Sequence, residues 1–174
     1  LGSIVVSTKL MPGVITLHMI IALLIIILMI YSYFLSKKNK SFLNSFLKKK
    51  EVKFFIILNL TAMFFQIILG SQVRESIDQI AIIFGENMRN TWIANLGFEF
   101  IIHRSFSLFI LALNLYLVYL LLTTKDFLNS NFRIVSIILF LIILEILSGA
   151  GMAYFAIPSY LQPVHLLIAF LIFG

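Results

Sequence analysis

The sequence predicts an all-α integral membrane protein, and its composition, its long apolar stretches and an internal repeat all indicate this class. Of the 174 residues, 61% are hydrophobic and 11% are charged, and the mean hydropathy is +1.10. Soluble domains are only about 45–50% apolar. Four apolar stretches are long enough to cross a bilayer as helices, which takes about 20 residues.

The expected spanning helices follow one another with the charged residues gathered between them. They are predicted at residues 15–35, 54–74, 99–122 and 133–156. Residues 1–8 resemble the outer end of a helix that starts before them, and a fifth apolar segment begins near Pro163. We therefore expect both ends of the sequence to belong to helices of a longer parent protein.

The loop at residues 36–53 sets the expected orientation. It holds seven lysines and one glutamate, and an excess of positive charge is typical of cytoplasmic loops. The loop at 75–98 has no lysine and is expected outside. Apolar residues recur in it at helical spacing, which predicts a short amphipathic helix on the membrane surface. These residues are Ile77, Ile80, Ala81, Phe84, Met88 and Trp92.

Residues 1–25 and residues 147–172 are copies of each other. In each copy a glycine lies sixteen residues before a histidine, Gly2 before His18 and Gly149 before His165. Repeats of this kind indicate that one structural unit occurs twice. The sequence therefore predicts a parent of two pseudo-symmetric four-helix bundles.

This chain would hold parts of both predicted halves. Residues 1–35 would be the end of the N-terminal half, which receives substrate if the resemblance given below holds. Residues 36–53 would be a basic cytoplasmic linker, and residues 54–174 most of the C-terminal half.

The three histidines are the candidate functional residues. His18, His103 and His165 each lie a few residues in from the outer end of an expected helix, and an ionisable group inside a membrane marks a functional site by default. Two histidines at one depth on neighbouring helices can hold haem iron from both sides. His103 and His165 are the predicted pair, and a hydrogen bond to a neighbouring helix is the alternative role for any one histidine.

Two arginines and one glutamate accompany the pair. Arg104 follows His103 directly, and Arg74 ends the preceding span. Either guanidinium could bind a haem propionate through paired hydrogen bonds, and interfacial snorkelling is the alternative for Arg104. Glu99 lies one turn before His103 and would either orient a ligand or be a solvated acid at a helix N-terminus.

Small and polar residues recur inside the expected helices. Gly2, Gly70 and Gly149 are expected where a planar macrocycle or a neighbouring helix comes close. Gln66 and Glu145 occupy matching places in QIILG and EILSG. Packing hydrogen bonds are their expected role.

Composition also excludes some functions. The chain has no cysteine, which excludes disulfides, zinc–cysteine sites and a thiol nucleophile. The net charge of +6 does not indicate a nucleic-acid partner, because the positive charge is concentrated in the loop at 36–53.

The sequence resembles the C-terminal two thirds of the haem A synthase family, in its cysteine-free bacterial subgroup. Its opening residues resemble that family's third-to-fourth helix segment. The segments that carry the rest of the resemblance are QIILGSQVR at 66–74, FEFIIHRS at 98–105 and IPSYLQPVHLLIAFLIFG at 157–174.

The resemblance implies a multi-pass protein of the bacterial inner membrane that oxidises a methyl group of haem O to the formyl group of haem A. It places a haem b cofactor on His103 and His165, near the outer face, and assigns His18 to the half that receives haem O. The catalytic residue is expected before residue 1, so it stays unknown here and Glu99 is not assigned that role. Membrane lipid and haem O synthase are the candidate partners.

Two other readings remain at this point. A bis-histidine b-type cytochrome could act only in electron transfer, but such proteins place haems near both membrane faces, whereas all three histidines lie near one face. A transporter with internal repeats usually has broken helices, and none is evident in the sequence.

Overall fold

The computed structural model describes residues 2–8, 12–36, 50–122 and 125–173, which form helices joined by short links. Along the chain they are α1 (Gly2–Ser7), α2 (Pro12–Ser36), α4 (Lys50–Phe84), the 3₁₀ turns η1 (Glu86–Thr91) and η2 (Ile93–Asn95), α5 (Phe98–Leu122), α6 (Lys125–Tyr154) and α7 (Leu161–Phe173). Within these residues, α2, α4, α5 and α6 are long and apolar enough to cross a membrane. The predicted all-α integral membrane fold is confirmed, while the pseudo-symmetry of two halves stays a prediction.

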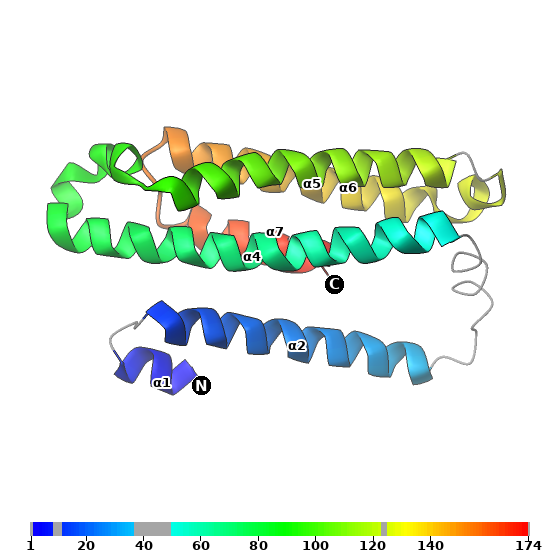
Figure 1. The fold of residues 1–174 in the computed structure, drawn as a ribbon, viewed down its shortest axis with the longest axis horizontal. Helices are drawn as coiled ribbons and strands as arrows, with labels where there is room; N and C mark the ends of the chain where they lie inside the picture. The colour runs from blue at the N-terminus through cyan, green and yellow to red at the C-terminus, as the bar shows by residue number, and fades with distance from the viewer. Residues whose placement is uncertain (1, 9–11, 37–49, 123–124, 174) are drawn as a thin grey trace.

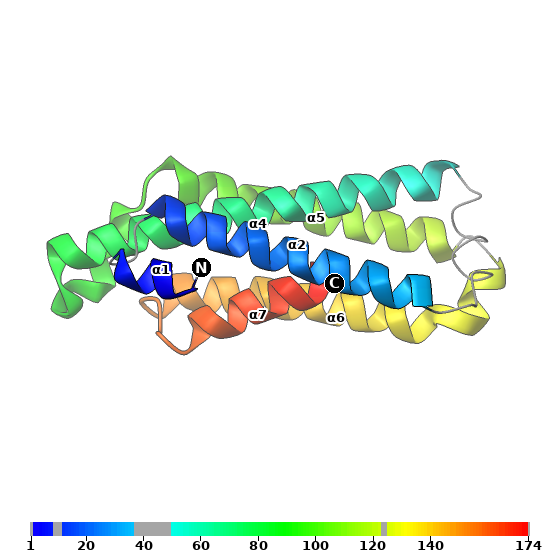
Figure 2. The ribbon, with the colours of Figure 1, turned by 90° about the horizontal axis from the view of Figure 1, so that it is seen from below.

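The helices lie along one common axis and alternate in direction (Figures 1 and 2). α4 packs mainly on α5, and α6 packs mainly on α7. α2 lies beside α4 and runs antiparallel to it. The α4–α5 and α6–α7 links lie at one end of the bundle, and the end of α2 and the starts of α4 and α6 lie at the other. The sequence predicted this arrangement, in which the loops at 36–53 and 75–98 lie at opposite ends of the bundle.

α4 is longer than predicted, and it takes up the first part of the expected outer loop at 75–98. The helix continues without a break to Phe84 instead of ending at residue 74. Its last turns carry Ile77 and Ile80, which pack on the indole of Trp92, a side chain that is only 2% exposed. The apolar spacing that suggested a separate surface helix therefore builds a cap over one end of the bundle. The buried members of this cap are Val73, Ile77, Ile80, Trp92 and Ile157.

The helices also begin earlier than predicted at the lysine-rich end. α4 begins at Lys50, inside the loop expected at 36–53, and α6 begins at Lys125, before the start predicted for its span at residue 133. Hydrogen bonds from each residue to the fourth before it let a helix extend past an apolar core without leaving backbone groups unpaired. Residues 37–49, which hold most of the loop lysines, lie outside the described residues.

The link between α6 and α7 determines where α7 begins. Ala156 and Ile157 have φ values of 56° and 52°, a left-handed conformation that is unfavourable for a β-branched residue. The Ile157 N–H donates to the Met152 carbonyl at 2.8 Å, and the Ile157 side chain is buried in the Trp92 cap. These contacts stabilise the strained turn. α7 then starts at Leu161, two residues earlier than predicted, and His165 falls about one turn inside it.

Candidate functional site

His103 on α5 and His165 on α7 lie face to edge inside the bundle. Their ring centroids are 6.5 Å apart and their planes are inclined by 73°. An imidazole nitrogen lies about 2 Å from a bound metal, so two rings on opposite sides of one ion would have centres roughly 6–6.5 Å apart. The structure therefore brings the two predicted residues together at a separation that suits a shared metal.

Each ring of the pair lies against a glycine of the preceding helix. A Cβ atom built on Gly70 of α4 would be 3.2 Å from Cε1 of His103, and one built on Gly149 of α6 would be 3.3 Å from Cε1 of His165. Both distances are tighter than an ordinary carbon–carbon contact. The close approach expected at Gly70 and Gly149 is thus an approach by the histidines themselves.

The His165 ring is held by two side chains of α6. Its Nδ1 lies 2.8 Å from Oγ of Ser148 and 3.3 Å from Oε1 of Glu145. The Ser148 hydroxyl also donates to the Glu145 carbonyl at 2.8 Å. The ring is therefore fixed in rotation as well as in position.

The His103 ring is placed differently. Gln66 of α4 donates through Nε2 to the His103 backbone carbonyl at 3.0 Å. This bond holds the backbone of α5, and the imidazole of His103 takes no part in it. Nδ1 of His103 is buried and has no hydrogen-bond partner within the described residues. Gln66 and Gly70 have the same spacing as Glu145 and Gly149, but only the second pair bonds its imidazole.

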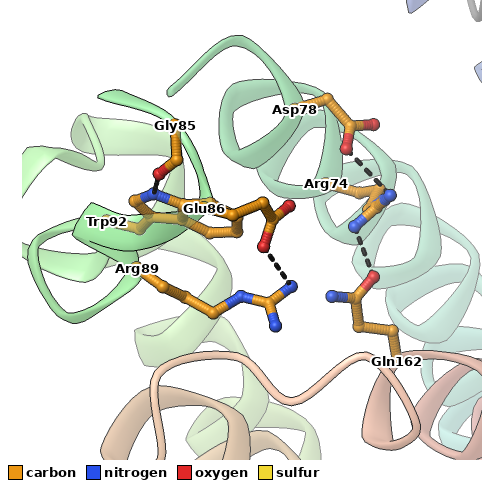
Figure 3. A network of polar contacts seen from close by, with 7 residues as sticks. All are labelled: Arg74, Asp78, Gly85, Glu86, Arg89, Trp92 and Gln162. Carbon is orange, nitrogen blue, oxygen red and sulfur yellow. Dashed lines mark hydrogen bonds and ion pairs between the residues drawn. The ribbon is translucent and has the colours of Figure 1, made fainter. Parts of the chain in front are cut away.

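Arg74 lies one turn beyond Gly70 and joins α4 to α7. Its Nη1 donates to Oε1 of Gln162, three residues before His165, and its Nη2 forms an ion pair with Asp78 at 2.8 Å (Figure 3). Arg74 is therefore close along both helices to the histidine pair. This predicted propionate ligand is engaged with protein groups in the structure.

A second polar set lies beside it at the same end (Figure 3). Arg89 pairs with Glu86 at 3.4 Å and lies over the Trp92 ring, and Trp92 Nε1 donates to the Gly85 carbonyl at 3.3 Å. These bonds hold the 3₁₀ turns over the end of the helices.

Arg104 and Glu99 contact groups other than the two imidazoles. The Arg104 side chain is exposed, and its guanidinium lies 5.9 Å from the centre of the Phe100 ring. Glu99 accepts a hydrogen bond from the Gly97 N–H at 3.2 Å through its own carboxylate. This is the helix N-terminal acid that the sequence allowed as one alternative.

His18 lies on α2 with an exposed side chain. Oγ1 of Thr16 and Oγ of Ser71 are 3.1 Å apart, and Ser71 follows Gly70, so α2 docks at the level of the histidine pair. His18 is two residues further, about 3 Å along the helix axis. Within the described residues it has no hydrogen bond, ion pair or ring contact with His103 or His165. The position beside Gly2 is open.

The comparison with protein families places the whole sequence in one of them. The family model COX15-CtaA, described as cytochrome oxidase assembly protein, matches residues 1–174. The chain belongs to this family. The family is that of the haem A synthases, so the recognition made from the sequence is confirmed, together with a role in haem A assembly for cytochrome oxidase. No curated protein and no solved structure was found to match.

The residues around His103 and His165 fit a haem. Two imidazoles face each other from different helices, and glycines at both positions leave no side chain between ring and backbone. Within the described residues, no cluster of three or more His, Asp or Glu side chains could hold a bare metal ion. Two protein ligands are what an iron already held by a macrocycle requires.

Ser148 is the part of the site that the sequence analysis did not single out, and the contact of Glu145 with the histidine was also not foreseen. The available signal was the shared spacing of EILSG and QIILG, four residues from a polar side chain to a glycine. The sequence analysis expected packing hydrogen bonds from Glu145, and the structure shows that its carboxyl contacts His165.

Proposed function

We propose that this protein is a haem A synthase, which oxidises a methyl group of haem O to the formyl group of haem A in the membrane. Membership of the COX15-CtaA family supports the pathway. The observation that supports a haem-based oxidoreductase is the approach of His103 and His165 to 6.5 Å between their ring centres, each against a glycine.

In this proposal His103 and His165 hold the iron of a haem b from both sides. A resident haem supplies one-electron redox chemistry, which can carry away electrons released as the methyl group is oxidised. The protein's part is to position the two imidazoles: Ser148 and Glu145 hold the His165 ring, and Gln66 holds the backbone of His103. Arg74 is the better placed of the two candidate propionate partners, because Arg104 is turned towards Phe100.

His18 belongs, in the same proposal, to the half that receives haem O. Its position on a helix separate from the four that surround the pair supports two sites at one depth, because α2 docks at Ser71 beside Gly70. A second haem with its own ligands would then lie beside the first.

The activity test uses the protein expressed from its complete gene together with a source of haem O. Pigments are extracted and separated by chromatography. We expect haem A from the native protein, and little or none from His18→Ala, which should still carry the haem b of His103 and His165. An electron-transfer cytochrome would make no haem A in any variant. Folded native protein that makes no haem A in the presence of haem O would contradict the synthase assignment.

We also propose a bacterial inner-membrane location with the loop at 36–53 in the cytoplasm. The helix ends next to this loop lie at the end of the bundle opposite the α4–α5 link, and the histidine pair lies towards that link. Membrane lipid surrounds the helices, and haem O synthase is the candidate partner that delivers substrate.

Single cysteines in this cysteine-free chain test the orientation. We expect an impermeant thiol reagent to label Asn87→Cys in intact cells and to label Asn44→Cys only after lysis. The reverse pattern would place the histidines near the inner face.

A further inference from the structure

The geometry points to Ser148 and Glu145 as positioning residues for one haem ligand: together they hold the Nδ1–H of His165, so that Nε2 is the atom presented to the iron. This inference rests on the proposed haem site. It adds to that site an orienting pair that acts on one histidine of the two.

The hydrogen-bond directions around Ser148 fix the tautomer of His165. A serine hydroxyl has one proton to donate, and Ser148 donates it to the Glu145 backbone carbonyl at 2.8 Å. Its oxygen can therefore only accept from Nδ1 of His165, 2.8 Å away. A neutral imidazole that carries its proton on Nδ1 has its free lone pair on Nε2, which is the metal-binding form.

Glu145 strengthens the same arrangement. Its Oε1 lies 3.3 Å from Nδ1, and its side chain is only 20% exposed. Its Oε2 is buried with no partner within the described residues, so the ring is the polar group that this carboxyl contacts. A carboxyl group in the middle of a membrane helix is costly and by default marks a functional site. Metal-bound histidines commonly donate their second N–H to such a group, which raises ligand basicity.

The placement of these residues on α6 explains how they reach one ring. Glu145, Ser148 and Gly149 are spaced i, i+3 and i+4, so they lie on one face of the helix. The two polar side chains bond Nδ1, and the glycine leaves room for Cε1 at 3.3 Å from a Cβ position. One face of α6 therefore contacts the His165 imidazole through two polar side chains and a glycine.

His103 has no equivalent support. Gln66 bonds its backbone carbonyl, and its Nδ1 is buried without a partner within the described part of the chain. The proposal therefore makes His165 the stronger electron donor of two unequal ligands. Electron donation by an axial ligand stabilises the ferric state, so these bonds should lower the midpoint potential of the haem.

The test measures haem content, low-spin electron paramagnetic resonance and midpoint potential on the purified full-length protein. Ser148→Ala and Glu145→Leu should each move the potential to a more positive value and broaden or shift the low-spin signal. Glu145→Gln should give a smaller shift, because its amide oxygen still accepts. Ser148→Thr keeps the hydroxyl and should restore native values. Ser136→Ala, an exposed serine of the same helix, is the matched control.

The outcomes separate this inference from the proposed function. Loss of haem from folded, monodisperse Ser148→Ala protein, with haem retained in Ser148→Thr, would support positioning as strongly as a potential shift. Native potential and signal in both Ser148→Ala and Glu145→Leu would overturn the inference while leaving the haem site intact. A native protein without haem, or a b-type spectrum that survives His165→Ala, would instead remove the proposed function on which it rests.

Discussion

The α4–α5 pair and the α6–α7 pair carry the same three elements, yet they treat their histidines differently. Each has a polar residue and a glycine four apart on the first helix and a histidine on the second. On α4, Gln66 bonds the backbone of His103, whereas on α6 Glu145 and Ser148 bond the ring of His165. The comparison teaches that similar packing of two helix pairs can give one fixed histidine ring and one adaptable histidine ring.

The largest expected effect is the loss of a ligand. His103→Ala and His165→Ala should each abolish the low-spin bis-histidine spectrum of the reduced protein, because six-coordinate iron needs both nitrogens. We expect His103→Ala to keep more five-coordinate haem than His165→Ala, because His165, which Ser148 and Glu145 orient, remains in the first variant. Absorption spectra of purified protein measure both. A bis-histidine spectrum that survives both changes would show that the pair is not the ligand set.

A smaller effect is expected when a methyl group is added at the glycines. Gly149→Ala should lower haem content more than Gly70→Ala, because Ser148 and Glu145 prevent His165 from moving away, whereas the His103 ring has no such bonds. Overpacking typically costs about 1–3 kcal/mol. Gly13→Ala, where nothing lies within 4 Å, is the control. Equal losses at Gly70 and Gly149 would argue that the two rings are equally free.

The two pairs also show how far sequence reasoning reaches. The order of the spanning helices followed from apolar length, because a span needs about 20 residues whatever its neighbours are. The meeting of His103 and His165 followed from their common depth. The bond from Ser148 could not be foreseen, because it depends on which face of α6 turns towards α7, and a helix that is apolar all round gives little signal for its rotation.

The extension of α4 was missed for a related reason. The spacing of Ile77, Ile80 and Phe84 is helical in either case, and periodicity does not tell whether a helix bends onto a surface or continues straight. The deciding contact is the burial of Trp92 against Ile77 and Ile80, which joins residues from either side of the link. Thr16 contacts Ser71, which places α2 beside the level of the histidine pair, but the membrane depth of His18 and its ligand partner stay predictions.

A third effect concerns the far end of the α4–α5 pair. Asn59 and Asn114 are buried and exchange two side-chain hydrogen bonds, at 2.7 Å and 3.0 Å. Asn59→Ala leaves the Asn114 amide partly unpaired and should lower the free energy of unfolding by about 0.6–2 kcal/mol. Thermal unfolding in detergent measures this. The double change to leucine should cost less than the single one, because it leaves no buried amide unpaired. The opposite order would show that the intact amide pair contributes more than the penalty of one unpaired partner.

The smallest effect is expected where the two helix pairs are joined to each other. Arg74 of α4 donates to Gln162 of α7, and it also pairs with Asp78, but the Arg74 side chain is 43% exposed. Exposed ion pairs and rim hydrogen bonds contribute at most about 1 kcal/mol, so Gln162→Ala should shift the unfolding midpoint only slightly. Because Gln162 lies three residues before the oriented ligand, any change in midpoint potential should also be far smaller than that of Ser148→Ala. Gln162→Glu would place a carboxylate beside Arg74 and should regain the lost stability. A potential shift from Gln162→Ala as large as that from Ser148→Ala would mean that α7 is oriented mainly by its contact with α4. The difference between the fixed His165 ring and the adaptable His103 ring would then depend on the α4–α7 contact and not on Ser148 and Glu145.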